Sequence, residues 1–427
     1  IAYYPHPKSC IYKLNSSNNM GHIENFWIDS NTTDQAKRWK CSGCSACESI
    51  CGKKAITMHI DQEGFMYPVV NRDLCVDCGL CVSVCPISNR CENDAAYLKS
   101  FGGFSTNERV INSCASGGVA TTLAIATIQN GGSVFGVQYS YDYSSAEYIK
   151  IDSLDGLWSL CSSKYIQPSK TGIHALVKEE LLTGHPVLFV GCPCDVAALK
   201  RYLHKEYDNL LTCELFCAGI TSAKLLADYL AMREKNVGSK LVAFNVRNKD
   251  KGWFVQHIKE EYENGKIFYK NHFGTYLGYG FLTFRRPSCY HCQYKQNTTY
   301  CDIKVGDFWG IKNTDPFWNP KGVSVILAKT QKGVTTLEAL KEFQLYEVDY
   351  AKATANNNGF VGTPNNTLEA KRNIFAHEFI YNGLLKACKK TAPLSFWIKY
   401  YVPSSFHSAL KRLYHSIIDK KYETNNR

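Results

Sequence analysis

Two cysteine-rich stretches decide how the N-terminal part of the chain folds: CSGCSACESIC at residues 41–51 and CVDCGLCVSVCP at residues 75–86. Each contains the spacing C-x2-C-x2-C-x3-C, and the second ends in cysteine followed by proline. In runs of this kind, three cysteines bind one 4Fe–4S cluster and the fourth crosses to the neighbouring cluster. The sequence therefore predicts two clusters. The ligands are Cys41, Cys44, Cys47 and Cys85 for one cluster, and Cys75, Cys78, Cys81 and Cys51 for the other.

The spacer between the runs predicts two short strands, at residues 55–60 and 65–70, around a turn at residues 61–64. A disulfide framework would need an oxidising compartment, and eight thiols so close together suit metal better. A tetrahedral zinc site has no use for a third cysteine at this spacing and a fourth after it. Gly52 stands where the first run usually carries proline. These features predict a bacterial-ferredoxin-like domain.

The chain of 427 residues is too long for a ferredoxin alone, and at one domain per ~150 residues it predicts about three domains. No apolar stretch is long enough to span a membrane, and no secretory signal is evident. Twenty cysteines without such a signal indicate a reducing cytoplasm and metal binding. The predicted organisation is a lead-in at 1–36, the two-cluster domain at 37–92, a larger domain at 96–345 (parts 96–172 and 173–345) and a helical basic extension at 346–427.

The net charge of +11 is concentrated at the C-terminal end, where residues 383–427 hold nine Lys or Arg and two Asp or Glu. A solvated helical tail explains this charge, and so does binding to an acidic partner such as a ferredoxin or to an anionic membrane surface, which would make the protein peripheral to the membrane. Nucleic acid is not expected as a partner, because no RNP-like aromatic pattern or zinc-finger pattern occurs.

Strands and helices alternate between about residues 100 and 345, among them a strand at 133–139 and helices at 173–182 and 334–343, which predicts a mixed α/β domain and an α+β class for the whole chain. The segment NSCASGG at 112–118 precedes the helical pattern VATTLAIATIQN. A glycine-rich helix start suits a phosphate, because its N–H groups lack partners within the helix. A helix cap packed against the sheet explains this pattern equally well. No GxGxxG follows a strand and no P-loop is present.

Seven more cysteines lie outside the paired runs but near the ends of predicted strands, where thiols from separate segments can meet. Cysteine is also a common small residue of hydrophobic cores, so this pattern alone leaves both interpretations open. The seven are Cys192, Cys194, Cys213, Cys217, Cys289, Cys292 and Cys301.

Motifs across residues 38–330 make the chain resemble the beta-subunit family of coenzyme F420 hydrogenases and dehydrogenases, whose wider family includes 7-hydroxymethyl chlorophyll reductases. The resemblance implies FAD in the α/β domain and a further 4Fe–4S cluster close to it. Cys192 and Cys301 are cysteines that the family pattern does not require, so each is a rival ligand. The motifs are SGG at 116–118, SKY at 163–165, G-x-P-C at 191–194, FC-x-G at 216–219, C-x2-C at 289–292 and DI-x2-GD at 302–307.

The resemblance assigns the third cluster and the flavin contacts residue by residue. The cluster ligands are Cys194, Cys217, Cys289 and Cys292, and the FAD contacts are Ser116, Gly117, Gly118, Ser163, Lys164 and Tyr165.

Clusters that move single electrons and a flavin that accepts a hydride together predict an iron–sulfur flavin-dependent oxidoreductase. Its electrons pass between a ferredoxin-like donor or partner subunit and an organic molecule, either an F420-like deazaflavin or another unsaturated compound. An electron-transfer subunit without its own substrate and a non-catalytic iron–sulfur binding module are the alternatives. The sequence identifies no catalytic side chain, and Lys164, His291 or a tyrosine are equal candidates to deliver a proton.

Overall fold

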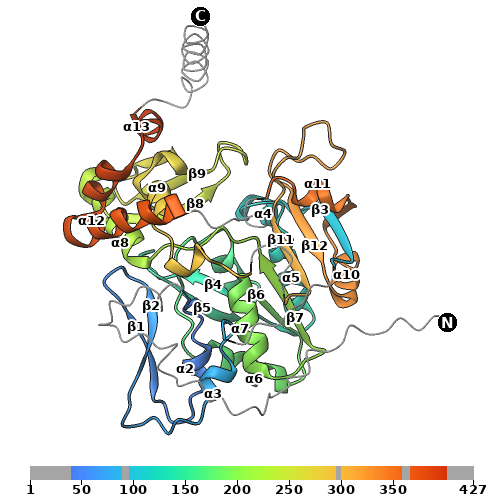
Figure 1. The fold of residues 1–427 in the computed structure, drawn as a ribbon. Coiled ribbons are helices and arrows are strands. Elements are labelled where there is room, and N and C mark those ends of the chain that lie inside the picture. The colour runs from blue at the N-terminus through green and yellow to red at the C-terminus, as the bar shows by residue number, and fades with distance from the viewer. Residues whose placement is uncertain (1–39, 89–95, 295–299, 358–365, 402–427) are drawn as a thin grey trace, which may run out of the picture.

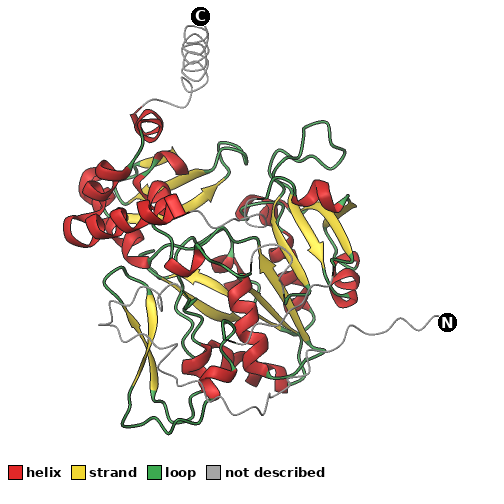
Figure 2. Ribbon diagram, viewed as in Figure 1, coloured by secondary structure: helices red, strands yellow, loops and turns green. Residues whose placement is uncertain are grey.

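The fold was obtained as a computed structural model, which describes residues 40–88, 96–294, 300–357 and 366–401 (Figure 1). The predicted lead-in at 1–36 and the last residues of the basic extension, 402–427, lie outside the described residues. The fold is α+β, with a small two-stranded unit next to a large mixed sheet and a helical lobe (Figure 2). No described helix combines the length and the apolar character needed to cross a membrane.

The two-cluster region contains a small antiparallel sheet with a short helix from each cysteine run beside it (Figure 1). Both strands confirm the strands expected from the spacer, and each begins one residue later than predicted. The elements are α2 (Ala46–Ile50), β1 (Ile56–Ile60), β2 (Met66–Val70) and α3 (Leu80–Ser83).

The central element is an eight-stranded mixed sheet. Its four middle strands, β11, β7, β6 and β4, run parallel, so their carboxyl ends lie at one edge of the sheet. The outer strands pair antiparallel. In spatial order the strands are β13 (Phe343–Glu347), β3 (Lys99–Ser105), β12 (Ser324–Ala328), β11 (Ile303–Asp307), β7 (Leu210–Leu215), β6 (Val187–Gly191), β4 (Ser133–Tyr139) and β5 (Ala146–Ile151).

Helices cover both faces of this sheet, because its buried strands alternate apolar side chains between two cores. Val134 packs with Leu123 of α5, whereas its neighbour Phe135 packs with Val177 of α6 and Val196 of α7. The helices around the sheet are α4 (Glu108–Ser113), α5 (Val119–Gln129), η2 (Gly156–Leu160), α6 (Ile173–Leu182), α7 (Pro193–Leu203), α10 (Gln331–Glu338) and α11 (Tyr350–Thr354).

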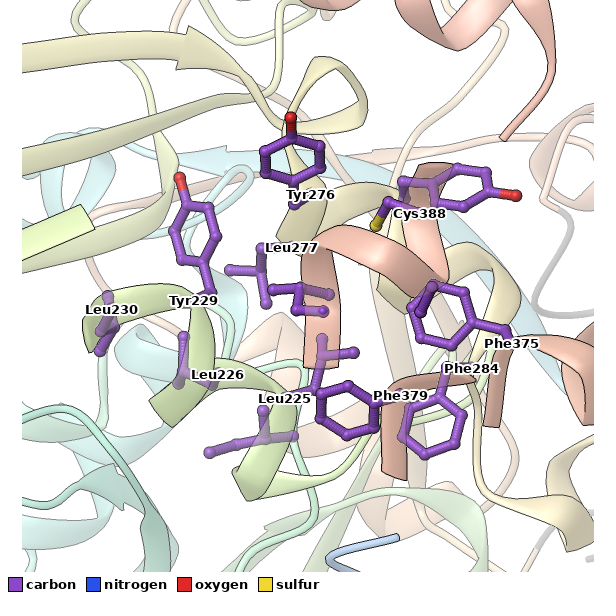
Figure 3. Packing of buried hydrophobic residues seen from close by; sticks show 14 of the residues in the cluster. Leu225, Leu226, Tyr229, Leu230, Tyr276, Leu277, Phe284, Phe375, Phe379 and Cys388 are labelled. Atoms are coloured by element: carbon purple, nitrogen blue, oxygen red, sulfur yellow. The ribbon is translucent and has the colours of Figure 1, made fainter. Parts of the chain in front are cut away.

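A second lobe joins a three-stranded antiparallel sheet to helices from distant parts of the chain. Figure 3 shows Phe375 and Phe379 from the C-terminal part packed near Phe284, and Cys388 lies in the same buried cluster. The described part of the basic extension therefore contributes to a hydrophobic core. The lobe contains α8 (Ala223–Val237), β8 (Leu241–Asn248), β9 (His257–Tyr262), β10 (Ile267–Asn271), η3 (His272–Gly274), α9 (Tyr276–Thr283), η4 (Pro287–Cys289), α12 (Asn366–Thr391) and α13 (Leu394–Tyr401).

One stretch differs from the sequence-based expectation, which placed a helix over residues 334–343. The helix α10 ends at Glu338, and Phe343–Glu347 forms the edge strand β13, which pairs antiparallel with β3. The free edge of β3 supplies backbone partners that a sequence pattern cannot reveal.

A buried arginine ties the two-cluster region to the rest of the molecule. Arg286 is fully buried and donates from Nε to the carbonyl of Cys41 at 2.9 Å and from Nη2 to the carbonyl of Met66 at 3.0 Å. Its Nη1 donates to Oε1 of Gln167 at 3.0 Å. Because three segments depend on one side chain, the first cysteine run has a defined position beside the large sheet.

Candidate iron–sulfur and flavin site

The first four predicted ligand thiols lie together. Cys41, Cys44, Cys47 and Cys85 line one pocket, where burial and a charge on Cys85 raise the pKa of Cys44 to about 12. The backbone N–H of Gly43 donates to Sγ of Cys41 at 3.4 Å. Hydrogen bonds to sulfur of this type are among the features that tune iron–sulfur clusters.

The second four also group as the crossed ligand pattern requires. Burial, then charges on Cys78 and Cys75, raise the pKa of Cys81 to about 11. Cys51 packs in the same cluster as Cys75 and Cys81, and its Sγ accepts a hydrogen bond from the N–H of Ala55 at 3.3 Å. Cys47 belongs to this packing cluster too, so the two thiol sets adjoin.

Metal binding needs the deprotonated sulfur and releases its proton, so the grouping of these thiols, rather than their raised pKa values, is the feature that suits iron–sulfur clusters. In the described ranges, no three His, Cys, Asp or Glu side chains surround a position for one metal ion. Ligands of a cubane bind different iron atoms, so they are not expected to meet at a single point. The crossed assignment stays a prediction that this arrangement fits.

A third set of thiols comes from three distant segments. Burial raises the pKa of Cys289 to about 12, and charges on Cys217 and Cys292 contribute to this rise. The pKa of Cys194 is raised by burial and by neighbours that include Cys217 and Cys292. The N–H of Gly219 donates to Sγ of Cys217 at 3.4 Å. The four ligands implied by the family resemblance are therefore close to one another.

The structure separates the remaining cysteine candidates. The side chain of Cys192 hydrogen-bonds with that of Cys217 and lies at the third set. Cys301 instead packs in the core between the sheet and helices α6 and α7, and Cys213 packs in the core on the opposite face. Cys192 is thus the rival ligand that geometry allows.

Lys170 lies between the first and third thiol sets. Its Nζ is 2.9 Å from Oδ1 of Asp195 and donates to the carbonyl of Gly43 at 3.4 Å. Burial lowers the pKa of Lys170, but the charges of Asp195, Cys194 and Cys44 outweigh burial and raise it to about 12. The buried ammonium group of Lys170 therefore contacts residues next to both the first and the third thiol set.

A cavity of about 1020 Å³ opens at the carboxyl edge of the parallel strands. This edge is where open α/β sheets usually bind ligands, and the volume suits a large cofactor. Cys194, Cys217, Cys289 and Cys292 line one part of the wall. Predicted flavin contacts line another part: Ser116, Gly118, Ser163, Lys164 and Tyr165.

Helix α5 starts at this wall. Gly118 is its N-cap with φ +90°, and no side chain in the described part of the chain caps the first turn. Gly117 lies behind the wall, where a Cβ would come within 2.3 Å of the carbonyl oxygen of Gly103. Ser116 donates its hydroxyl to the carbonyl of Val323 at 2.7 Å. The backbone N–H groups at this helix start, rather than the serine hydroxyl, are therefore the natural phosphate donors.

The segment at 163–165 is positioned by Lys164 and Tyr165. Nζ of Lys164 donates to the carbonyls of Leu160 at 3.1 Å and Cys161 at 2.8 Å, and burial lowers its pKa to about 8. The ring of Tyr165 stacks on Phe281 with centroids 4.7 Å apart. Lys164 therefore shapes the loop, while the aromatic pair forms an apolar wall.

His272 is a cavity residue that the sequence did not indicate. It is 1% exposed, and neither ring nitrogen has a hydrogen-bond partner within the described part of the chain. Burial, followed by the charge of Arg247, lowers its pKa to about 3, so the ring is neutral at pH 7. It follows a hairpin without any motif, so only its burial beside the cavity marks it as functional. His291 also lines the cavity and lies 3.2 Å from Glu369.

Two family models match parts of the chain. Residues 184–353 match the model that describes the C terminus of the beta subunit of coenzyme F420 hydrogenase/dehydrogenase, and residues 40–89 match a 4Fe–4S dicluster domain. Over these ranges the chain is similar to the coenzyme F420 hydrogenase/dehydrogenase beta-subunit family with a 4Fe–4S domain before it, in agreement with the resemblance seen in the sequence. Its ferredoxin-like domain and mixed α/β fold confirm the sequence-based expectation. The matches support an iron–sulfur electron-transfer subunit related to this family.

A chain from a solved structure also matches, titled as a xenon derivative of the F420-reducing nickel–iron hydrogenase complex from Methanosarcina barkeri. The match has 16% identity and a TM-score of 0.42, and it covers 69% of this chain and 91% of the other. No curated protein sequence matches the chain.

Proposed function

We propose that the protein is an iron–sulfur flavoprotein oxidoreductase. It passes electrons between a ferredoxin-like donor or partner subunit, three 4Fe–4S clusters and FAD, with hydride transfer to or from an organic acceptor such as a deazaflavin. One observation carries the proposal: the same large cavity is bordered both by the third thiol set and by the start of α5 with residues 163–165. Bound clusters would supply single-electron transfer, and FAD would couple it to two-electron chemistry.

Neighbouring thiol sets adjoin, since Cys47 packs with the second set and Lys170 lies between the first and third sets. Cys78 of the second set is exposed, whereas Cys44 and Cys47 of the first set are buried. Leu74 and Val76 beside the second set are also exposed apolar residues, which suits contact with a redox partner. We therefore place the partner at the second set, followed by the first set, the third set and the cavity.

Different parts of the cavity wall suit different parts of a flavin. The N–H groups at the start of α5 suit its phosphates, and the stacked Tyr165 and Phe281 offer an apolar surface for its ring. His272 is neutral, so one ring nitrogen can donate a hydrogen bond and the other can accept one. Its nitrogens are the groups we assign to contact the polar edge of the flavin.

Anaerobic cofactor analysis tests this assignment directly. Three cubanes and one flavin predict about twelve iron atoms and about one FAD per chain. About eight iron atoms would remove the third cluster, and a protein that binds no flavin would contradict the enzyme proposal.

An electron-transfer subunit without its own substrate is the alternative that needs a separate assay. The purified holoprotein is reduced with a diffusible dye and mixed with F420 or a related hydride acceptor. Reduction of the acceptor supports an enzyme, whereas rapid reduction of bound flavin without acceptor turnover supports the electron-transfer subunit.

A further inference from the structure

Two cysteines at the cavity wall belong to none of the three thiol sets. Cys114 follows α4, and Cys161 follows η2, yet both line the same cavity. The hydroxyl of Thr121, in the first turn of α5, lies 3.0 Å from Sγ of Cys114 and 3.6 Å from Sγ of Cys161. The two thiols also hydrogen-bond to each other. They therefore form a pair from two separate segments.

The pair is asymmetric. Cys114 is buried and Cys161 is partly exposed. The pKa of Cys161 is lowered to about 7, because the hydrogen bond from Cys114, the contact with Thr121 and the positive charges of Lys164 and Arg109 together outweigh burial. The pKa of Cys114 is raised, because the same hydrogen bond and burial both favour its protonated form. A partly exposed thiol near cations and a buried partner correspond to an attacking and a resolving cysteine.

We propose that Cys114 and Cys161 form a dithiol–disulfide couple beside the flavin cavity and exchange two electrons between bound flavin and a disulfide substrate. The substrate class is a small or protein-borne disulfide. The inference rests on the proposed function, because the internal partner of the couple is the proposed flavin.

The exchange balances in two stages. A bound reduced flavin would supply two electrons and become oxidised; the Cys114–Cys161 bond would break, each sulfur would take up one proton, and Cys161 would then release its proton to solvent. The Cys161 thiolate then attacks the substrate disulfide, and one substrate sulfur leaves and takes a proton. Cys114 loses its proton and attacks Sγ of Cys161, which restores the internal disulfide and releases the second substrate thiol.

Peptide mapping tests the couple without using activity. The holoprotein is equilibrated anaerobically in mixtures of oxidised and reduced dithiothreitol, alkylated and digested with trypsin. Cleavage places the two cysteines in separate peptides, 110–150 and 151–164, each with one cysteine. We expect a reducible linked pair of these peptides at oxidising ratios, which disappears in Cys114→Ser and Cys161→Ser.

Cys388→Ala is the matched control, because Cys388 is a buried core thiol outside the cavity and its loss leaves the linked pair unchanged. Absence of the linked pair at every ratio, or a mixed disulfide on Cys161 alone, would overturn the inference.

Absorption spectra of the flavin-loaded protein test contact between the pair and the cofactor. With thiols reduced and flavin oxidised, we expect a long-wavelength thiolate–flavin charge-transfer band that Cys161→Ser loses and Cys114→Ser retains. Bound flavin without linked peptides overturns this inference alone. Linked peptides in a protein that binds no flavin overturn the proposed function and the flavin half of this inference.

Discussion

The thiols of the two-cluster region and those of the cavity differ in how the chain brings them together. The first eight come from two runs within 41–85, each with its ligands a few residues apart. Cys194 lies in the first turn of α7 after β6, Cys217 follows β7, and Cys289 is the last residue of η4 in the second lobe. The thiols of the two-cluster region can be predicted to group from their short spacing in the sequence. The grouping of the cavity thiols depends on which strands lie next to each other in the fold.

The two regions also differ in exposure. The outer thiol set reaches the surface at Cys78, while the third set lines the wall of the large cavity, where its cysteines are partly exposed. A site on a short loop near the surface suits electron exchange with a partner, and a site inside the cavity suits transfer to a bound cofactor. The following predictions test this contrast, from the largest expected effect to the smallest.

The third thiol set is tested first by Cys289→Ala. We expect loss of one cluster, so that iron falls from about twelve to about eight atoms per chain while the paired clusters remain. Iron analysis and low-temperature electron paramagnetic resonance of the reduced protein measure this loss.

The control for that variant is Cys301→Ala, which removes a core thiol and should leave the iron content unchanged. Cys192→Ala decides between the rival ligands: unchanged iron supports the implied set, and loss of the third cluster places Cys192 among the ligands. Iron lost from Cys301→Ala but kept in Cys289→Ala would contradict the structure.

Arg286→Met tests how the two regions are joined. The substitution removes the hydrogen bonds to Cys41, Met66 and Gln167, although Oε1 of Gln167 keeps the N–H of Met66 as a donor, so we expect a loss of about 3 kcal/mol in the free energy of unfolding. Anaerobic denaturant unfolding of the holoprotein measures it.

Arg72→Met provides the exposed counterpart. Nη1 of Arg72 lies 3.8 Å from Oδ1 of Asp77 at the surface, so the loss of this side chain should change the free energy of unfolding by less than about 1 kcal/mol. If both substitutions change the free energy of unfolding equally, the buried hydrogen bonds of Arg286 do not hold the two-cluster region to the rest of the molecule.

Gly118→Ala tests the start of α5 as the phosphate site. Gly118 has φ +90°, and an added Cβ would come within 2.8 Å of Val110. We expect the strain from this φ value and this contact to distort the helix start and to cost about 1–2 kcal/mol of the FAD-binding free energy, which corresponds to roughly tenfold weaker binding. Titration of the apoprotein with FAD measures this affinity.

Gly131→Ala is the matched control, since Gly131 has φ +73° at the other end of the same helix with open space around it. It carries similar backbone strain but should leave FAD affinity unchanged. If both variants bind FAD equally, the helix start does not hold the phosphates.

Alkylation of Cys161 gives the smallest effect. Because its pKa is lowered to about 7, the reactive thiolate forms as pH rises through about 7, and the rate should level off above about pH 8. The rate of iodoacetamide labelling of peptide 151–164 measures this profile. A midpoint near that of an ordinary thiol, about 8.5, would show that the pair does not activate Cys161.

The sequence located several elements closely and missed others for identifiable reasons. The strand β4 and the helix α6 have the bounds expected from their hydrophobic patterns. The edge strand β13 was expected to belong to a helix, because its partner β3 is distant in sequence. His272 was not anticipated, since its functional signal is the burial of two unpaired nitrogens at a cavity wall within the described ranges.

By itself, the sequence determined that Cys41 and Cys75 each begin a cluster-binding run and that the chain resembles the beta-subunit family of coenzyme F420 hydrogenases and dehydrogenases. Only the tertiary structure separated Cys192 from Cys301 and brought Cys114 to Cys161. The physical reason is the number of residues between the partner cysteines. Two cysteines three residues apart lie close together because the covalent geometry of the chain limits their separation. Thiols tens of residues apart meet only where strand order and packing bring their segments together.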